Sequence, residues 1–135
     1  MIRLATNEDY RRIAIALSHK EPLNYITKKH VREDIAQGAC YVLEEDRKIV
    51  AICSLVYDDT FKYHYLKRLL ILNKRNQSKG YATAILTKLA QKKEKIAITP
   101  FQTNKSMIRL VKKLGFTYRY NFLDEYCFYT KEGNE

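Results

Sequence analysis

A buried strand that runs through a polar turn into a helix constrains the fold of this chain more than any other feature. Residues 69–72 are four aliphatic side chains in a row, a short apolar run that is typical of a buried strand. After the turn, Ala82, Ile85 and Leu89 recur at the spacing of one helix face. Gly80 lies in the turn, and its missing side chain lets a bulky group approach the backbone there.

The helix start that this turn creates predicts an anion site. The backbone N–H groups of residues 78–83 lie at the positive end of the helix dipole, where several have no partner within the helix. A phosphate group is the usual ligand of such a helix start. The turn lacks the Gly-Lys-Ser/Thr ending of a P-loop and the three glycines of a dinucleotide fingerprint. An ordinary helix start that contains a glycine is the alternative.

The chain length of 135 residues predicts one domain, residues 1–135, with one core. A hydrophobic fraction of 46% is typical of a globular protein. The longest apolar run, residues 49–53, is too short to span a bilayer, and residues 1–4 begin a strand rather than a secretion signal. Cys40, Cys53 and Cys127 lie in apolar runs without metal-binding spacing, so we expect buried thiols in a reducing cytoplasm and no bound metal.

The apolar periodicity and the turn residues predict seven strands and four helices. Strands are expected at residues 2–4, 40–43, 48–57, 63–72, 95–99, 116–123 and 125–130. Helices are expected from a cap at Thr6 to Ser18, from a cap at Thr27 to Gly38, from the Gly80 turn onward, and from a cap at Thr103 or Asn104 to Gly115. The order β-α-α-β-β-β-α-β-α-β-β predicts an α/β fold, with a mixed sheet covered by helices on both faces.

Positive charge is concentrated in one part of the chain. The net charge is +10, yet residues 1–60 hold 9 basic and 10 acidic side chains, while residues 61–123 hold 15 basic and one acidic, Glu94. The predicted phosphate site therefore lies within a strongly positive segment. A solvated, lysine-rich surface explains part of this net charge, but it explains less well why the basic side chains are concentrated in residues 61–123.

The turn and a second segment together resemble the GNAT superfamily of N-acetyltransferases. Gln77, Gly80 and Ala82 match the acyl-CoA signature of that family, Gln/Arg-x-x-Gly-x-Gly/Ala. The family's segment Asn-x-x-Ala-x-x-x-Tyr-x-Lys-x-Gly-Phe is matched further on at Asn104, Lys113, Gly115 and Phe116. The predicted element order is also that of the family, so the resemblance covers nearly the whole chain.

The resemblance implies a reaction in which an amine attacks the thioester of acetyl-CoA. The residues that it implies for binding this cosubstrate lie on the turn, on the helix after it and at the second motif: Gln77, Ser78, Lys79, Gly80, Tyr81, Ala82, Thr83 and Asn104. A backbone N–H of Leu70, Ile71 or Leu72 would polarise the thioester carbonyl, provided that the strand at 63–72 splays away from the strand at 95–99 as the resemblance implies.

The chain departs from the family pattern where protons are transferred. The tyrosine of the second motif is Val111 here, residues 63–68 contain no carboxylate, and the next strand ends in Thr99. The catalytic residues are therefore unassigned. We expect a thiolate that leaves without an acid, which a thiol pKa of about 8.5 permits, or an acid drawn from Tyr118, Tyr120, Tyr126 and Tyr129. His64 is interpreted as the only histidine near the expected site, and as a surface residue of its strand.

No motif predicts the acceptor amine, and several functions stay open. The first is acetylation of a small molecule, a peptide or a protein, by a monomer or a homodimer. The second is acetylation of a charged tRNA, which the basic segment favours and Val111 disfavours, and the third is a catalytically weak acyl-CoA-binding module. A plain nucleic-acid binder is disfavoured because no RNA- or DNA-binding motif occurs. Coenzyme A carries only about four negative charges, so we expect the surplus positive charge to meet a second polyanion or an acidic acceptor.

Overall fold

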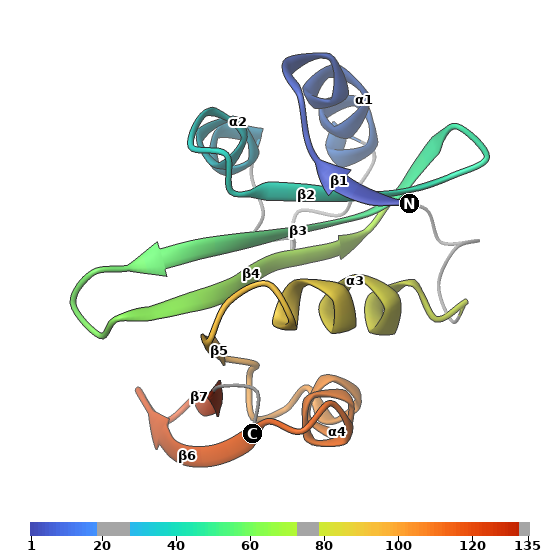
Figure 1. Ribbon diagram of the computed structural model, residues 1–135. Helices are drawn as coiled ribbons and strands as arrows, with labels where there is room; N and C mark the ends of the chain where they lie inside the picture. Colours follow the sequence, from blue (N-terminus) through green and yellow to red (C-terminus); the bar gives the residue numbers. More distant parts are fainter. Residues whose placement is uncertain (19–27, 73–78, 133–135) are drawn as a thin grey trace.

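One seven-stranded sheet runs through the part of the chain that the computed structural model describes, residues 1–18, 28–72 and 79–132 (Figure 1). Its strands lie in the order β1-β2-β3-β4-β5-β7-β6. Their bounds are β1 Ile2–Leu4, β2 Cys40–Glu45, β3 Lys48–Asp58, β4 Tyr63–Ile71, β5 Lys95–Ile98, β6 Thr117–Phe122 and β7 Tyr126–Glu132. The helices are α1 Asn7–Ser18, α2 Lys28–Ala36, α3 Tyr81–Ala90 and α4 Lys105–Lys113.

This architecture confirms the predicted mixed α/β fold and its element order. Neighbouring strands are antiparallel except β4 and β5, which are parallel. β7 extends to Glu132, two residues beyond its predicted end, because Glu132 still pairs with Lys95 of β5. The predicted helix cap at Thr27 lies outside the described residues. Within the described ranges, no helix combines the length and the apolar character that crossing a membrane requires.

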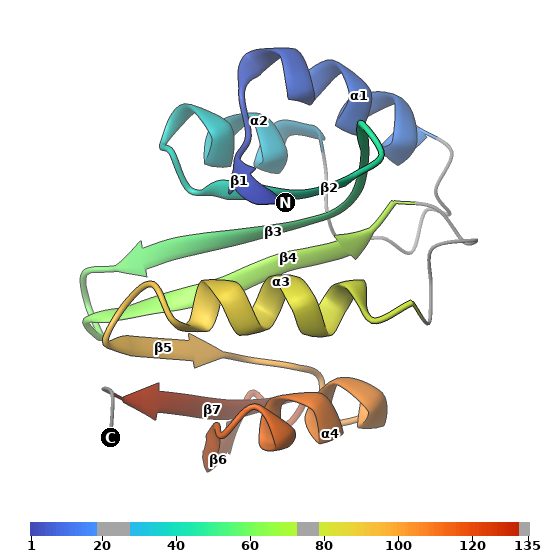
Figure 2. The ribbon, with the colours of Figure 1, turned by 45° about the vertical axis from the view of Figure 1, so that its right-hand side comes forward.

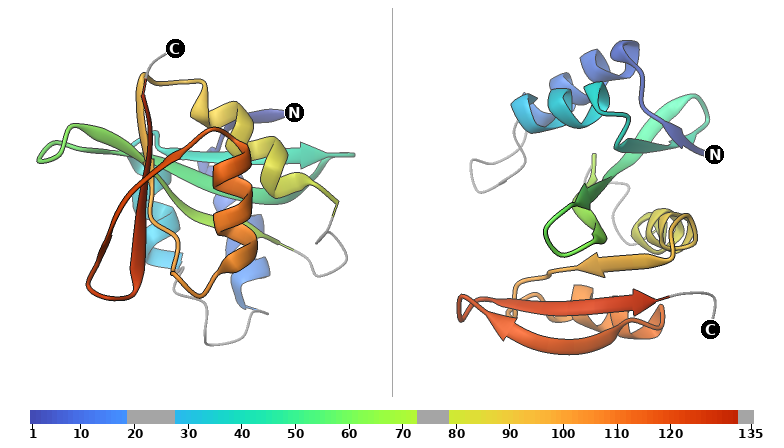
Figure 3. Two further views of the ribbon diagram at one scale, coloured as in Figure 1. Left: turned by 90° about the horizontal axis from the view of Figure 1, so that it is seen from below. Right: turned by 60° about the vertical axis from the view of Figure 1, so that its left-hand side comes forward.

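The helices cover both faces of the sheet, and each face has its own core. Figures 2 and 3 show α1 and α2 on one face and α3 and α4 on the other. The larger core lies under α3 and α4, and its fully buried side chains include Ile85, Leu86, Leu89 and Val111. The smaller core lies under α1 and α2 and includes Ile13, Val31, Val42 and Ile52. Burial of these apolar side chains is the main force that holds the helices on the sheet.

Three helix ends follow the signals predicted from the sequence. Asn104, rather than Thr103, caps α4, because its Oδ1 accepts the backbone N–H of Met107 at 3.2 Å. Gly38 and Gly115 follow α2 and α4 with φ of +68° and +94°, the left-handed conformation in which a glycine ends a helix.

β4 and β5 separate partway along their length. Three residue pairs join the two strands, and the last of them is Leu66 with Ile98. Beyond Leu66, β4 continues beside β3 to Ile71. The chain after β5 stays with β7 instead, since Pro100 accepts the backbone N–H of Cys127 at 2.9 Å. The expected splay is therefore present, and it divides the sheet near its centre.

A buried carboxylate ties β1 to the start of α1. Asp9 is 3% exposed, and the guanidinium of Arg3 binds its two oxygens at 2.6 and 3.0 Å. Asp9 also accepts the backbone N–H of Thr6 at 2.7 Å, while Thr6 Oγ1 accepts the N–H of Asp9 at 3.4 Å, which forms a capping box. The hydrogen bond from Arg3, supported by Thr6, lowers the pKa of Asp9 to about 2.

Asp9→Asn should lower the free energy of unfolding at pH 7 by about 2 kcal/mol, because the pKa of Asp9 lies about two units below its ordinary value. The ionised carboxylate stabilises the fold above about pH 4, and this contribution is lost as the pH falls through about 2. Urea denaturation of the wild-type protein and of the variant between pH 7 and pH 2 should therefore show a difference in the free energy of unfolding that becomes smaller as the pH falls. Glu8→Gln, an exposed neighbour on the same helix turn, is the control. If the difference in the free energy of unfolding did not depend on pH, the charge of Asp9 would not contribute to stability.

Candidate functional site

A β-bulge distorts β4 at the point where this strand leaves β5. The register with β3 shifts between Ile52 and Ser54, so Cys53 faces both Arg68 and Leu69. Arg68 has a φ of +55°, in the left-handed region that costs a residue with a side chain about 1 to 2 kcal/mol. Contacts around Arg68 must offset that cost.

Asp34 of α2 holds the side chain of Arg68. The Nε and Nη2 atoms of Arg68 donate to the two oxygens of Asp34 at 2.5 and 2.6 Å, which makes a bidentate pair. Ser54 Oγ donates to the same carboxylate at 2.6 Å. The side chains of Asp34 and Arg68 are 5% and 22% exposed, so most of the pair lies out of water. This network fixes the bulge and joins α2 to the centre of the sheet.

A cavity of about 440 Å³ fills the splay between β4 and β5. Its lining comes from β4, from the segment around and after the end of β5, and from α2 and α4: His30, Leu66, Lys67, Arg68, Leu69, Ile98, Thr99, Pro100, Phe101, Asn104 and Met107. His30 belongs to α2 on one face of the sheet, and Met107 belongs to α4 on the other. Because helices of both faces contribute to it, this splay cavity can receive one molecule from each side.

The backbone of β4 beyond the bulge presents its amides to two sides. Leu72 donates its N–H to the carbonyl of Val50 at 3.0 Å, so this amide, one of three predicted to polarise a thioester, is paired with β3. Successive residues of a strand point their N–H groups to opposite sides. The N–H of Leu70 is therefore oriented toward β3 as well, and that of Ile71 toward the side of the splay.

α3 begins directly after the glycine turn, near the C-terminal end of β4 (Figure 2). Gly80 precedes the first helical residue with a φ of +80°, which glycine adopts without strain. Gly80 provides no side-chain cap, and the N–H groups of residues 81–83 have no acceptor within the helix. Lys79 and Gly80 are exposed. Gln77 and Ser78, which were predicted to act with them, lie outside the described residues.

α4 brings one predicted residue to the splay cavity and buries another. Asn104 lines the cavity and caps the helix at the same time. Val111, at the position where the second motif of the resembled family has a tyrosine, is fully buried in the core with Ile85 and Leu86. The position therefore points into the interior of the protein and holds no group that can transfer a proton.

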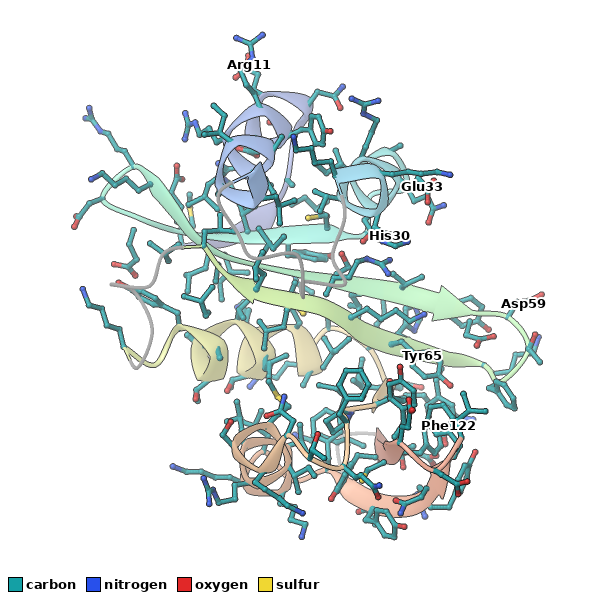
Figure 4. The ribbon with its side chains drawn as sticks, turned by 180° about the vertical axis from the view of Figure 1, so that it is seen from behind. Arg11, His30, Glu33, Asp59, Tyr65 and Phe122 are labelled. Carbon is teal, nitrogen blue, oxygen red and sulfur yellow. The ribbon has the colours of Figure 1, made fainter. Side chains whose placement is uncertain are left out.

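Among the described residues, His30 lines the splay cavity and His64 does not, so the prediction that His64 is the only histidine near the site is wrong. His30 lies in the first turn of α2, beside the strands (Figure 4). His64 pairs with Ile96 before β4 and β5 separate, which places it outside the splay. It lines a different cavity with Tyr57 and Lys93, where burial, and then the positive charge of Lys93, lowers the pKa of His64.

None of the four tyrosines considered as acids lines the splay cavity. Tyr118 and Tyr129 pack edge to face, with ring centroids 5.6 Å apart, and Tyr126 stacks on Phe101 at 4.7 Å. Tyr120 lines a third cavity, of about 330 Å³, beside the splay cavity. The two cavities adjoin, because Lys67 and Thr99 line both of them.

The three thiols are buried, as predicted, and none of them lines either of these cavities. Burial raises the pKa of Cys40 to about 12 and raises that of Cys53 as well, so neither thiol is a ready nucleophile. In the described part of the chain, no three His, Cys, Asp or Glu side chains are grouped as metal ligands would be.

Basic side chains gather on the outer surface of α4 and around the end of α3. The exposed ones are Lys88, Lys92, Lys93, Lys95, Lys105, Arg109, Lys112 and Lys113. Both helices lie on the same face of the sheet (Figure 3), so these side chains make that face positive. This face also carries the start of α3, residues 81–83.

A family model described as "Acetyltransferase (GNAT) domain" matches residues 36–118. The matched span contains β3, β4, the glycine turn, α3, β5 and α4, and it includes every lining residue of the splay cavity except His30. A search of curated protein sequences gives no match.

Solved structures share the fold over the whole chain. A GNAT-family acetyltransferase from Streptococcus agalactiae is 17% identical with a TM-score of 0.82, and the match covers 100% of this chain and 96% of that one. One from Bacillus cereus is 16% identical with a TM-score of 0.79, covering 100% and 98%. Spermidine N-acetyltransferase from Vibrio cholerae, solved in complex with CoA and spermine, is 15% identical with a TM-score of 0.74, covering 98% and 95%. At these identities the likeness is one of fold.

Asp34→Asn should lower the free energy of unfolding by about 3 kcal/mol, because it leaves the guanidinium of Arg68 largely buried without a counter-charge. Urea denaturation measures the change. Glu33→Gln removes an exposed carboxylate one residue earlier on α2 (Figure 4), and this control should change stability by less than about 0.5 kcal/mol. Equal effects of the two substitutions would show that the pair with Arg68 does not hold the bulge.

Proposed function

The chain belongs to the GNAT family of acetyltransferases, whose domain model matches residues 36–118, and we propose how its residues divide the reaction between the two faces of the sheet. It is an acyltransferase that transfers an acetyl group to an amine, and the donor in this family is acetyl-CoA. One observation carries the proposal: the splay cavity is lined by α2 from one face and by α4 from the other.

Acetyl-CoA is proposed to enter from the face that α3 and α4 cover. The N–H groups of residues 81–83 and the positive end of α3 suit a pyrophosphate, and Lys79 adds a positive charge beside them. Asn104 and Met107 form the α4 side of the cavity, along which the thioester would reach β4. The basic surface on this face adds a general attraction for the phosphates of the donor.

The amine is proposed to reach the thioester from the opposite face, past His30 of α2. Holding two reactants together in one cavity supplies ~7 kcal/mol or more toward the barrier. Only the neutral amine attacks, so an ammonium must first lose a proton. We assign this proton to His30, which lines the splay cavity and can accept it directly or through a water molecule. Attack forms the C–N bond and a tetrahedral carbon. The nitrogen then gives up its second proton to solvent, and collapse of the intermediate breaks the C–S bond.

The thiolate of coenzyme A is proposed to leave without an acid from the protein. A thiol pKa of about 8.5 makes the thiolate a tolerable leaving group near neutral pH. Val111 has no proton to give, and none of the four tyrosines considered as acids lines the splay cavity. The free thiolate then takes a proton from solvent.

Acetylation of an RNA-borne amine is a second candidate because of the charge on the α3 and α4 face. The exposed basic side chains there outnumber the roughly four negative charges of coenzyme A, so positive charge remains on this face to bind a second polyanion. The cavity beside the splay favours a small amine instead, since its lining contains one basic side chain, Lys67, among mostly aromatic ones.

Gly80→Glu should abolish binding of acetyl-CoA in calorimetry, where the wild-type protein should bind in the micromolar range. The substitution places a carboxylate at the proposed pyrophosphate site and a side chain at a φ of +80°. Gly38→Glu is the matched control: its φ is +68°, the space around it is equally open, and it lies at the end of α2. Wild-type affinity in the Gly80 variant would place the donor elsewhere.

His30→Gln should lower kcat by ~10²-fold or more while the KM for acetyl-CoA stays unchanged, because that is the usual contribution of a general base. His64→Gln is the control, since His64 lines a separate cavity, and it should keep full activity. The assay follows thiol release from acetyl-CoA with a panel of amines, peptides and aminoacyl-tRNA. An unchanged kcat in the His30 variant would mean that the amine loses its proton to solvent before it binds.

A further inference from the structure

The cavity of about 330 Å³ beside the splay has a mainly aromatic wall. Five of its eight lining side chains are aromatic: Phe61, Tyr65, Tyr120, Phe122 and Phe128. The other three are Asp58, Lys67 and Thr99. Tyr65 and Phe122, labelled in Figure 4, border this aromatic cavity from β4 and from the hairpin of β6 and β7.

The aromatic cavity lies on the α1 and α2 face of the sheet. Leu66 points into the core under α3 and α4, and side chains alternate along a strand, so its neighbours Tyr65 and Lys67 point to the opposite face. Phe128 is oriented in the same way, because its two neighbours on β7 both belong to the α3 and α4 core. A molecule in the aromatic cavity therefore faces the proposed donor across the sheet.

Ring contacts order the wall of this cavity before any ligand binds. Phe128 is 8% exposed and stands at the centre of the wall, with its ring centroid 5.0 Å from that of Tyr120 and 6.3 Å from that of Tyr65. Tyr63 packs edge-on against Phe128 at 5.9 Å, and its hydroxyl donates to Glu132. A rigid wall of rings loses little conformational entropy when a flat ligand binds to it.

The junction of the two cavities determines where an acceptor must place its amine. Lys67 and Thr99 line both cavities, so an amine beside them stands at the splay, and the rest of its molecule extends along the aromatic wall. The Nζ of Lys67 lies 5.4 Å from the ring centroid of Tyr65. This positive charge disfavours a second ammonium group near the reacting one.

The single carboxylate of the aromatic cavity, that of Asp58, uses one of its two oxygens in a turn. Asp58 accepts the backbone N–H groups of Thr60 and Phe61 at 2.8 and 3.4 Å, which shape the turn between β3 and β4. A polyamine carries several cationic groups, but the lining offers it one carboxylate, with one oxygen used by the turn, and one like charge, at Lys67. The cavity is suited to a flat apolar body rather than to a chain of cations.

We propose that the aromatic cavity is the acceptor subsite and that it takes a primary amine carried on an aromatic ring. This inference rests on the acetyl transfer proposed above, and it adds the class of substrate. Ring-to-ring contacts add to the burial of apolar area, and they should favour an aromatic amine over a saturated analogue of equal size by about two- to tenfold.

The test compares three amines with the wild-type protein: 2-phenylethylamine, 2-cyclohexylethylamine and spermidine. Initial rates at saturating acetyl-CoA give kcat/KM, and calorimetry in the presence of coenzyme A gives Kd. The value of kcat/KM for 2-phenylethylamine should exceed that for 2-cyclohexylethylamine by about threefold and that for spermidine by at least about tenfold. A preference for spermidine would overturn the proposal.

Two tyrosines of β6 give matched variants. Tyr120 and Tyr118 are 51% and 48% exposed, but Tyr120 lines the aromatic cavity while Tyr118 packs on Tyr129 at the other face. Tyr120→Ala should raise the KM for 2-phenylethylamine about fivefold and leave the KM for acetyl-CoA unchanged. Tyr118→Ala should leave both unchanged, with a similar melting temperature for the two variants. Equal effects of the two on the KM for 2-phenylethylamine would overturn the subsite.

Calorimetry separates failure of the subsite from failure of the acetyl transfer. If none of the three amines is acetylated, but 2-phenylethylamine binds and Tyr120→Ala alone weakens it, the subsite stands and the proposed reaction with such amines is wrong. If the wild-type protein acetylates other amines but does not bind 2-phenylethylamine, the reaction stands and the subsite is wrong.

Discussion

The bidentate pair between Asp34 and Arg68 is the interaction on which the site depends. It holds Arg68 in its left-handed conformation, and thereby fixes the bulge at which β4 leaves β5. The same carboxylate positions α2 over the splay. His30 and Asp34 are four residues apart and so lie on one side of that helix, which brings His30 to the cavity that the splay opens. One largely buried charge pair thus sets both the opening in the sheet and the side chain that faces it.

The sheet also separates two different kinds of recognition. On the α3 and α4 face, the proposed pyrophosphate site is built largely from backbone, namely the N–H groups at the start of α3. On the α1 and α2 face, the aromatic cavity is built from side chains of β4, β6, β7 and the β3–β4 turn. Backbone groups recognise what every donor molecule shares, whereas side chains can differ from one protein of a given fold to another and so select the acceptor.

The sequence predicted the features that depend on neighbouring residues. The strand, glycine turn and helix around Gly80 needed only local patterns, as did the cap at Asn104. His30 was missed because its place at the splay depends on a contact between residues 34 positions apart. The aromatic cavity was missed for another reason: a bulge between Tyr118 and Tyr120 sends these side chains to opposite faces, whereas regular alternation would place them on the same one.

The edge position of β6 has a consequence for how this protein can diversify. β6 is the last strand of the sheet, and its residues are largely exposed, so replacing one of them disturbs few neighbours. Two of the aromatic side chains that line the aromatic cavity, Tyr120 and Phe122, belong to this strand. Substitutions of Tyr120 and Phe122, on the opposite face of the sheet from α3, are expected to be additive with substitutions near α3. New acceptor preferences can accumulate on the outermost strand while donor recognition is inherited unaltered.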